Sequence, residues 1–199
     1  MANMKKITLG LAAAACSLAS LTAQSDPQPT CKTCPATYIT HDELQAYLKR
    51  GIANNIVDQQ VRAVDVGKSN VDVAMVYRGK LTAPGEVAEH DFVSEVYHII
   101  DGSATLVTGP DLVDKKRRPA DANNVKMLNG PGNGASSIRN GVAHQLKPGD
   151  VIVIPAGTGH WFTKIDDHIS YLMIRVDPDK VTPLKDEAAS KADLQKPVR

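Results

Sequence analysis

The chain has 199 residues, and its 23 Lys and Arg against 22 Asp and Glu give a formal net charge of +1. Because a nucleic-acid-binding domain usually carries a strong basic excess, this balance argues against a DNA or RNA partner. Hydrophobic residues make up 42% of the chain and charged residues 23%, which is ordinary for a globular protein and excludes wholesale disorder. The length suits one domain with arms.

Residues 1–23 have the pattern of a secretory signal peptide. Lys5 and Lys6 precede an apolar run over residues 7–21, and a small residue follows the run. The run is too short and too rich in alanine for a transmembrane span, which needs about 20 strongly apolar residues. We therefore expect a periplasmic or secreted protein whose net charge changes from +1 to −1 when the two lysines are removed. Cys16, after a run of alanines, leaves lipoprotein processing as a minor alternative.

Cys31 and Cys34 form a CxxC pair in the arm that follows, residues 24–54. In an oxidising compartment we expect a disulfide, either within this arm or between subunits. A thioredoxin-like redox site would need a preceding strand and a following helix, and Pro35 follows instead. Haem attachment would need His at that position, and zinc would need two further ligands nearby.

Residues 40–51 predict one short helix within the same arm. Thr40 is a suitable N-cap, and Glu43 follows three residues later as in a capping box. Apolar side chains recur at helical spacing through the segment, and Gly51 is placed to end it.

Strand patterns dominate residues 55–178, which we take as the folded barrel. Alternating or apolar runs, separated by turn residues, occupy residues 71–78, 95–108, 150–154 and 168–176. Many short strands with frequent turns predict an all-β sandwich or barrel.

Two other segments have no strand pattern. Residues 109–134 combine four consecutive basic residues with the sequence GPGNG, and we expect a long loop there. Residues 179–199 are charged and polar, and we expect a C-terminal tail that is disordered or forms a loose helix.

Two spaced motifs contain the candidate functional residues. The first spans residues 85–102, has glycine at each end, and contains His90 and Glu95. The second spans residues 149–160 as G-x5-P-x-G-x2-H and ends at His160. Alternate side chains of a strand share a face, so these three side chains can converge inside a barrel. Two imidazoles and one carboxylate form a facial set for a divalent metal ion.

The two motifs together resemble those of the cupin superfamily. This resemblance implies a double-stranded β-helix, or jelly-roll barrel, to which the residue patterns above add a short N-terminal helix and a long loop between the motifs. Lys164 replaces the final Asn of the second motif, Gly85 departs from the usual spacing, and Ala88 replaces the first His of the first motif. Most metal cupins use three His and one Glu, so one ligand is missing from the implied set of His90, Glu95 and His160.

Tyr97 is the best substitute for the missing ligand, because it lies two residues after Glu95 and shares its strand face. The pattern Glu95-x-Tyr97 is similar to that of cupin dimethylsulfoniopropionate lyases, in which such a Tyr binds metal and acts as a base. The resemblance implies a catalytic role for Tyr97, and the alternative is a core tyrosine with a satisfied hydroxyl group. Any of the divalent ions of Fe, Mn, Zn, Ni or Cu would suit these donors.

Together with the signal-peptide pattern, the resemblance implies an exported, metal-dependent enzyme that acts on a small organic molecule, by lyase or isomerase chemistry or with dioxygen. The alternative is a non-catalytic cupin that binds a sugar or metabolite. The cupin resemblance also implies a homodimer. We expect His98 to face outward, and either Trp161 or Phe162 to face inward. Tyr171 and Arg175 share a strand face, where they would form a sheet-edge ion pair or bind an acidic substrate.

Overall fold

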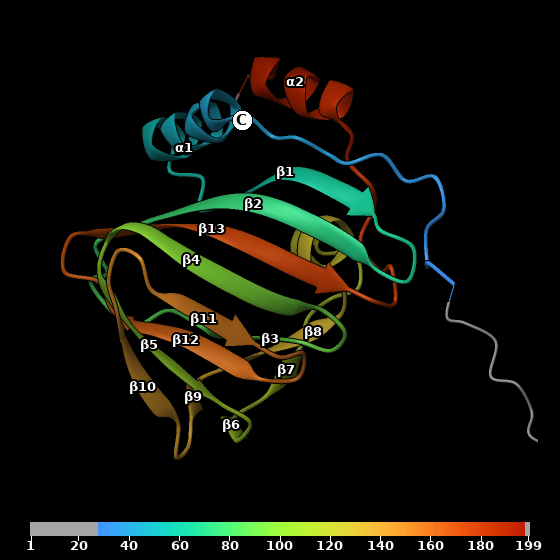
Figure 1. The fold of residues 1–199 in the computed structure, drawn as a ribbon. Coiled ribbons are helices and arrows are strands. Elements are labelled where there is room, and N and C mark those ends of the chain that lie inside the picture. Colours follow the sequence, from blue (N-terminus) through green and yellow to red (C-terminus); the bar gives the residue numbers. More distant parts are fainter. Residues whose placement is uncertain (1–27, 198–199) are drawn as a thin grey trace, which may run out of the picture.

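The computed structural model describes residues 28–197, which form two facing antiparallel sheets with helices against one outer face (Figure 1). The five-stranded sheet contains, in spatial order, β1 (Asp58–Asp65), β2 (Asn70–Gly79), β13 (His168–Asp177), β4 (Ser94–Gly102) and β11 (Val151–Ile154). The six-stranded sheet contains β10 (Val142–Leu146), β5 (Ala104–Gly109), β12 (Gly159–Lys164), β3 (Val87–His90), β8 (Gly132–Ala135) and β7 (Lys116–Arg117). A small third sheet pairs β6 (Leu112–Val113) with β9 (Ser137–Ile138). The prediction of an all-β, double-stranded β-helix with an N-terminal helix is confirmed.

The main core fills the space between the two large sheets. Inward-facing apolar side chains come from β2, β4, β5, β12 and β13, and include Ala74, Val76, Tyr97, Ile99, Leu106, Phe162, Tyr171 and Met173. Both predicted strands around Asp101 and Gly102 are present as β4 and β5. Gly102 has φ +77°, and a Cβ atom there would lie 2.1 Å from the carbonyl oxygen of His168. The sharp β4–β5 connection therefore requires glycine at this position.

Helix α1 (His41–Asn54) lies against the outer face of the five-stranded sheet, where Tyr47 packs on Val61 and Met75 (Figure 1). Thr40 is its N-cap and accepts a hydrogen bond from the Glu43 backbone N–H at 3.1 Å, as the capping box predicts. The predicted end of the helix at Gly51 is wrong.

The helix instead continues to Asn54 and ends at Asn55, which adopts a left-handed conformation with φ 55° and donates its backbone N–H to the Gly51 carbonyl. Gly51 itself is buried inside the helix, and a Cβ atom there would lie 2.7 Å from Nε2 of Gln59. The glycine is thus needed for close packing of α1 on β1.

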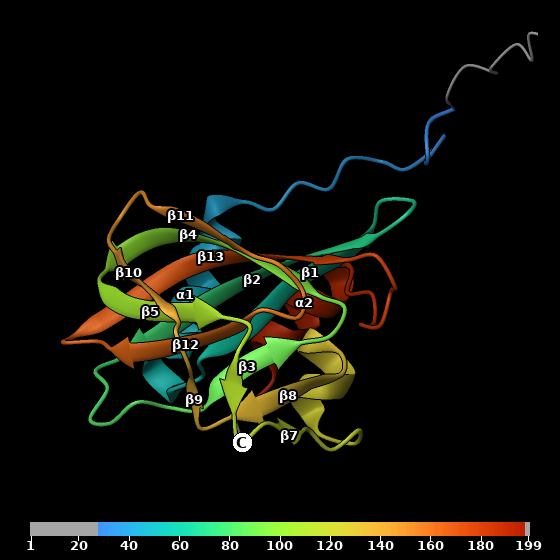
Figure 2. The same ribbon diagram turned by 90° about the horizontal axis from the view of Figure 1, so that it is seen from below.

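The segment 109–134, expected as a long loop, contains β6, β7, the short π-helical turn η1 (Val125–Asn129) and the start of β8. Strand β8 includes the last three residues of GPGNG, is buried, and pairs with β3 (Figure 2). A Cβ atom on Gly132 would lie 2.2 Å from the carbonyl oxygen of Glu89. The glycines therefore allow two backbones to approach closely inside the sheet.

The C-terminal segment is also ordered. Lys185 and Ala63 exchange backbone hydrogen bonds at the free edge of β1, and α2 (Glu187–Gln195) follows beside α1 (Figure 1). Asp186 caps α2 by accepting from the backbone N–H of Ala189. The expected tail is thus a folded part of the domain from Thr182 to Gln195.

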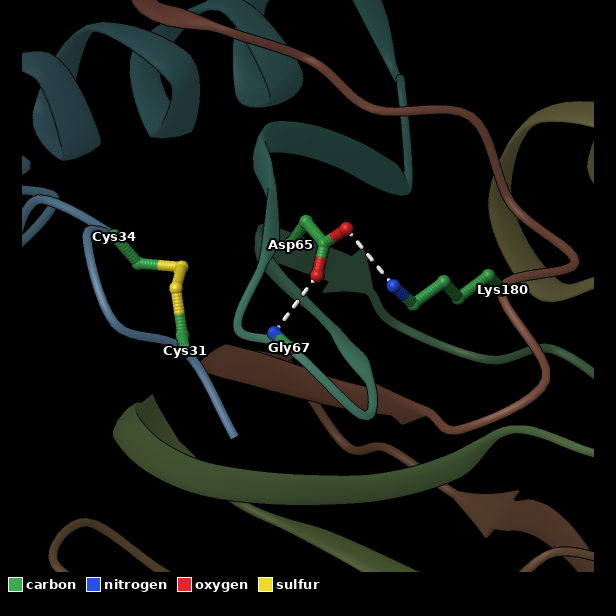
Figure 3. Close-up of a disulfide and its surroundings, with 5 residues drawn as sticks. All are labelled: Cys31, Cys34, Asp65, Gly67 and Lys180. Carbon is green, nitrogen blue, oxygen red and sulfur yellow. Dashed lines mark hydrogen bonds and ion pairs between the residues drawn. A yellow bond between two sulfur atoms is a disulfide. The ribbon is translucent and has the colours of Figure 1, made fainter. Parts of the chain in front are cut away.

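Cys31 and Cys34 form a disulfide within one arm (Figure 3). The disulfide lies beside the β1–β2 turn, where Asp65 accepts the Gly67 backbone N–H at 2.8 Å and pairs with Lys180 at 2.8 Å. The local disulfide is therefore confirmed. The predicted signal peptide and the lipoprotein alternative lie outside the described residues. None of the helices in residues 28–197 is long and apolar enough to cross a membrane.

Candidate metal centre

Three strands bring the candidate ligands to one point inside the barrel. His90 is the last residue of β3, Glu95 is the second residue of β4, and His160 is the second residue of β12. Strands β3 and β12 are neighbours, and the short connection from β3 to β4 crosses between the two large sheets. All three side chains are buried, as predicted from the two motifs.

The two imidazoles both face the Glu95 carboxylate. His90 Nε2 lies 3.4 Å from Glu95 Oε1, and His160 Nε2 lies 3.3 Å from Glu95 Oε2. One ligand atom from each of the three residues can be chosen so that all lie within 4.8 Å of one another. This arrangement is compact enough for the three atoms to share one ion.

Ala88 lies directly across from His160 in the β3–β12 pair. Facing residues of an antiparallel pair point to the same side of the sheet, so position 88 belongs to the barrel interior. Because residue 88 is alanine, this position contributes no ligand atom to the centre, as the first motif predicts.

Glu95 also accepts hydrogen bonds from Tyr97 and Arg175. The Tyr97 hydroxyl donates to Oε2 at 2.6 Å, and Arg175 Nε donates to Oε1 at 3.3 Å. Arg175 is fully buried and also forms an ion pair with Asp58 at the start of β1. The guanidinium group therefore supplies a positive charge between two carboxylates.

The sequence did not predict the pairing of Arg175 with Glu95 and Asp58. Arg175 lies on the central strand β13, directly opposite Glu95 in the neighbouring β4. The expected sheet-edge ion pair is thus wrong, because the partners lie inside the barrel. Only the strand order could have revealed them, since Asp58, Glu95 and Arg175 are far apart in sequence.

The ionisation of the centre is set by burial and by these neighbours. Burial lowers the pKa of His160 to about 4, so this imidazole is neutral at pH 7. Burial acts to raise the pKa of Glu95, but the adjacent His90, His160 and Arg175 hold it well below its usual value. A neutral imidazole beside a carboxylate is the ionisation state that metal ligation requires.

Tyr97 shares the inward face with Glu95, as predicted. Burial and the charge of Glu95 raise its pKa well above the usual value, so the hydroxyl is protonated in this arrangement. Its ring stacks on Tyr171 with centroids 4.4 Å apart, and Tyr171 in turn lies near Phe162. Arg78 donates to the Tyr171 hydroxyl at 3.2 Å and lies over the Phe162 ring. Aromatic side chains thus form one wall beside the candidate ligands.

Other predicted orientations can also be compared with the structure. Phe162 faces inward, whereas Trp161 faces outward and donates its indole N–H to the Gly85 carbonyl at 2.6 Å. His98 is exposed on the outer face of β4, as expected. His144 and His168 are half-buried, and His168 lies 3.1 Å from Asp101.

This chain is similar in part to several known proteins. A family model described as an AraC-like ligand binding domain matches residues 131–196. A Bacillus halodurans protein of solved structure is 15% identical, with 79% of this chain and 96% of that chain covered, at a TM-score of 0.42. An RmlC-like cupin family protein from Methanocaldococcus jannaschii is 12% identical, with 63% and 85% covered, at a TM-score of 0.36.

A chain from the crystal structures of two DMSP lyases is 20% identical, with 54% of this chain and 38% of that chain covered, at a TM-score of 0.32. No curated protein matches the sequence. The fold is the double-stranded β-helix that the cupin resemblance implies, and the family match covers its C-terminal part.

Proposed function

We propose that this protein is a metal-dependent cupin enzyme that acts on a small organic molecule. The observation that carries the proposal is the convergence of His90, Glu95 and His160 inside the barrel, with candidate ligand atoms within 4.8 Å of one another. Two imidazoles and one carboxylate suit several first-row divalent ions and leave coordination positions open. The metal ion would be Fe, Mn, Zn, Ni or Cu.

The orientation of the two imidazole rings fits a metal ion. His160 Nδ1 lies 3.2 Å from the Thr158 carbonyl oxygen, which favours a proton on Nδ1 and leaves the Nε2 lone pair directed toward the centre. His90 Nδ1 is buried and has no hydrogen-bond partner among the described residues. Because Nε2 of His90 also faces Glu95, both rings present the same nitrogen to the shared point.

The proposed chemistry depends on Tyr97. A divalent ion held by these ligands supplies Lewis acidity toward a carbonyl or carboxylate oxygen of the substrate. Tyr97 holds its proton on the phenolic oxygen and is placed beside Glu95, so it can serve as general acid and, after losing the proton, as general base. This role favours lyase or isomerase chemistry, with dioxygen chemistry as the alternative for Fe or Mn.

A non-catalytic, ligand-binding cupin is the second candidate, and one observation favours it. Both Glu95 oxygens already accept hydrogen bonds, one from Tyr97 and one from Arg175. The buried carboxylate is therefore compensated by protein groups alone, and under this alternative the domain binds a sugar or metabolite without any reaction.

Export to the periplasm or the medium is part of the proposal. It is supported by the signal-peptide pattern of residues 1–23 and by the Cys31–Cys34 disulfide, since disulfides persist mainly in oxidising compartments. N-terminal sequencing of the protein from its native cell tests it, because retention of residues 1–20 would contradict export. The homodimer implied by the cupin resemblance stays a prediction.

The enzymatic proposal is tested with the Tyr97→Phe variant. Metal-loaded wild-type protein is screened for turnover of small carbonyl and carboxylate compounds, and the variant is then compared for both activity and bound metal. Lost turnover with retained metal supports the acid–base role, whereas loss of both makes Tyr97 a metal ligand. Unchanged turnover removes Tyr97 from the mechanism, and a metal-loaded protein without turnover favours the ligand-binding alternative.

A further inference from the structure

A buried cluster of two carboxyl groups and one hydroxyl group joins the barrel to the C-terminal segment, residues 182–195. Asp72 lies on β2, Asp177 is the last residue of β13, and Thr182 is the first residue of the C-terminal segment. Asp72 and Asp177 are fully buried, and Thr182 is only 4% exposed. The candidate metal ligands are other residues, so this cluster does not depend on the proposed enzymatic function.

The Thr182 hydroxyl group contacts both carboxyl groups. Its Oγ1 lies 2.8 Å from Asp177 Oδ2 and 3.1 Å from Asp72 Oδ2. Asp177 also accepts the backbone N–H groups of Val181 at 3.0 Å and Thr182 at 2.9 Å, which suits an ionised carboxylate. A hydroxyl group has one proton to donate, so Thr182 cannot donate fully to both carboxyl groups. When Thr182 donates to Asp177, the contact with Asp72 needs a proton on Asp72.

The other surroundings of Asp72 also favour its protonated form. Its Oδ1 atom is buried without a hydrogen-bond partner among the described residues, which costs more for a carboxylate than for a neutral acid. Three charged side chains act on it, namely Asp177 on β13, Asp58 on β1 and Arg175, which lies opposite Asp72 on β13. Arg175 already pairs with Glu95 and Asp58. Burial therefore outweighs the attraction of Arg175 and raises the pKa of Asp72 to about 6.

The C-terminal segment is a lightly buried part of the fold. Lys185 exchanges backbone hydrogen bonds with Ala63 at the edge of β1. Ser190 is the single buried residue of α2, and its carbonyl accepts a hydrogen bond from the Tyr47 hydroxyl group at 3.0 Å. Segments that bury little surface open locally at a lower free energy than the core. The contacts of Thr182 can therefore determine how often this segment opens.

From these contacts we infer that Asp72 acts as a pH-sensitive latch for the C-terminal segment. The latch is closed while Asp72 donates its proton to Thr182 and Thr182 donates to Asp177. Loss of the proton leaves two carboxylates beside one hydroxyl group, and opening of the segment lets water solvate both. Opening also frees the backbone N–H and C=O groups of Ala63 at the edge of β1, which then become available to pair with another strand.

Hydrogen exchange of the full protein, followed by mass spectrometry and corrected for the intrinsic pH dependence of amide exchange, tests the latch. The pKa of Asp72 rises from its usual 3.8 to about 6 in the closed fold, so the closed form is favoured at low pH. Opening of residues 182–195 should therefore increase about tenfold from pH 5 to pH 8.

The role of Asp72 is tested with Asp72→Asn, which removes the titrating group and keeps a donor toward Thr182. Its opening should stay low and change less than threefold over the same pH range. Asp65→Asn is the matched control, because Asp65 is exposed and pairs with Lys180 just before the C-terminal segment. This control should keep the tenfold change, with circular dichroism and melting curves showing that both variants fold.

A measurement on the wild type alone covers the case in which Asp72→Asn does not fold. The carbon-13 resonance of the Asp72 side-chain carboxyl group, assigned through the backbone, should titrate at about pH 6. The inference is overturned if this resonance titrates below pH 5, or if exchange of residues 182–195 in the wild type changes less than threefold between pH 5 and pH 8. It is also overturned if folded Asp72→Asn keeps the tenfold change.

Discussion

Replacing Arg175 with Met tests the charge network inside the barrel. The side chain is fully buried and lies between two carboxylates, with Nε 3.3 Å from Glu95 Oε1 and a terminal nitrogen paired with Asp58. Removing one partner of a buried ion pair leaves an uncompensated charge, which costs about 3–5 kcal/mol of unfolding free energy. Methionine keeps much of the volume, so the loss reports mainly on charge.

Arg139→Met is the matched control for this prediction. Arg139 also lies 3.3 Å from a carboxylate oxygen, that of Asp111, but the two side chains are 63% and 46% exposed. Exposed ion pairs contribute only about 0–1 kcal/mol. Urea denaturation at pH 7 measures both variants without added metal, and a loss for Arg175→Met no larger than that for Arg139→Met would refute the reasoning.

A double-mutant cycle separates the Arg175–Glu95 contact from general damage to the core. In the Glu95→Gln background the charge of one partner is gone, so Arg175→Met should cost measurably less than in the wild type. The Arg175–Asp58 pair remains in that background, so some loss is still expected. Equal losses in the two backgrounds would show that Arg175 and Glu95 are not energetically coupled.

Two further variants test burial and backbone geometry. Burial raises the pKa of Asp72 to about 6, despite the Thr182 hydroxyl and the nearby Arg175, while Asp177 adds to the increase. The protonated form is therefore favoured in the fold, and its stabilising contribution is complete below about pH 4 and lost as pH rises through 6. Asp72→Asn should thus gain up to about 3 kcal/mol over the wild type between pH 4 and pH 8, whereas a pH-independent difference in urea denaturation would contradict this. Gly102→Ala should lose more than about 2 kcal/mol in the same assay, because it combines positive φ with the contact to His168, and a change below 0.5 kcal/mol would contradict it.

Local sequence signals predicted the elements whose causes are themselves local. Thr40 and Glu43 predict the start of α1, and the structure shows their capping hydrogen bond. Alternation within a strand likewise places Glu95 and Tyr97 on one inward face, and the Tyr97 hydroxyl indeed meets the Glu95 carboxylate. Such features depend on residues two to four positions apart and need no knowledge of the tertiary structure.

Features that depend on long-range packing were not predictable in the same way. Arg175 meets Glu95 because β13 and β4 are neighbours, and the sequence does not specify that strand order. The buried strand β8 lacks apolar alternation, since Gly132 lies close to the Glu89 backbone and Gly134 close to the Glu86 side chain. Gly51 likewise predicts a helix end, because the sequence alone does not distinguish a glycine that allows close packing inside a helix from a glycine that ends the helix.

Metal binding by the purified protein tests the central claim most directly. The protein is dialysed against each of Fe, Mn, Zn, Ni and Cu, and bound metal is measured by elemental analysis and calorimetry. We predict one ion per chain for at least one metal, lost in His90→Gln/His160→Gln and retained in His144→Gln, whose half-buried imidazole is hydrogen-bonded to Thr108 through its Nε2. Absence of binding by all five metals, or full binding by the double variant, would contradict the assignment of this centre.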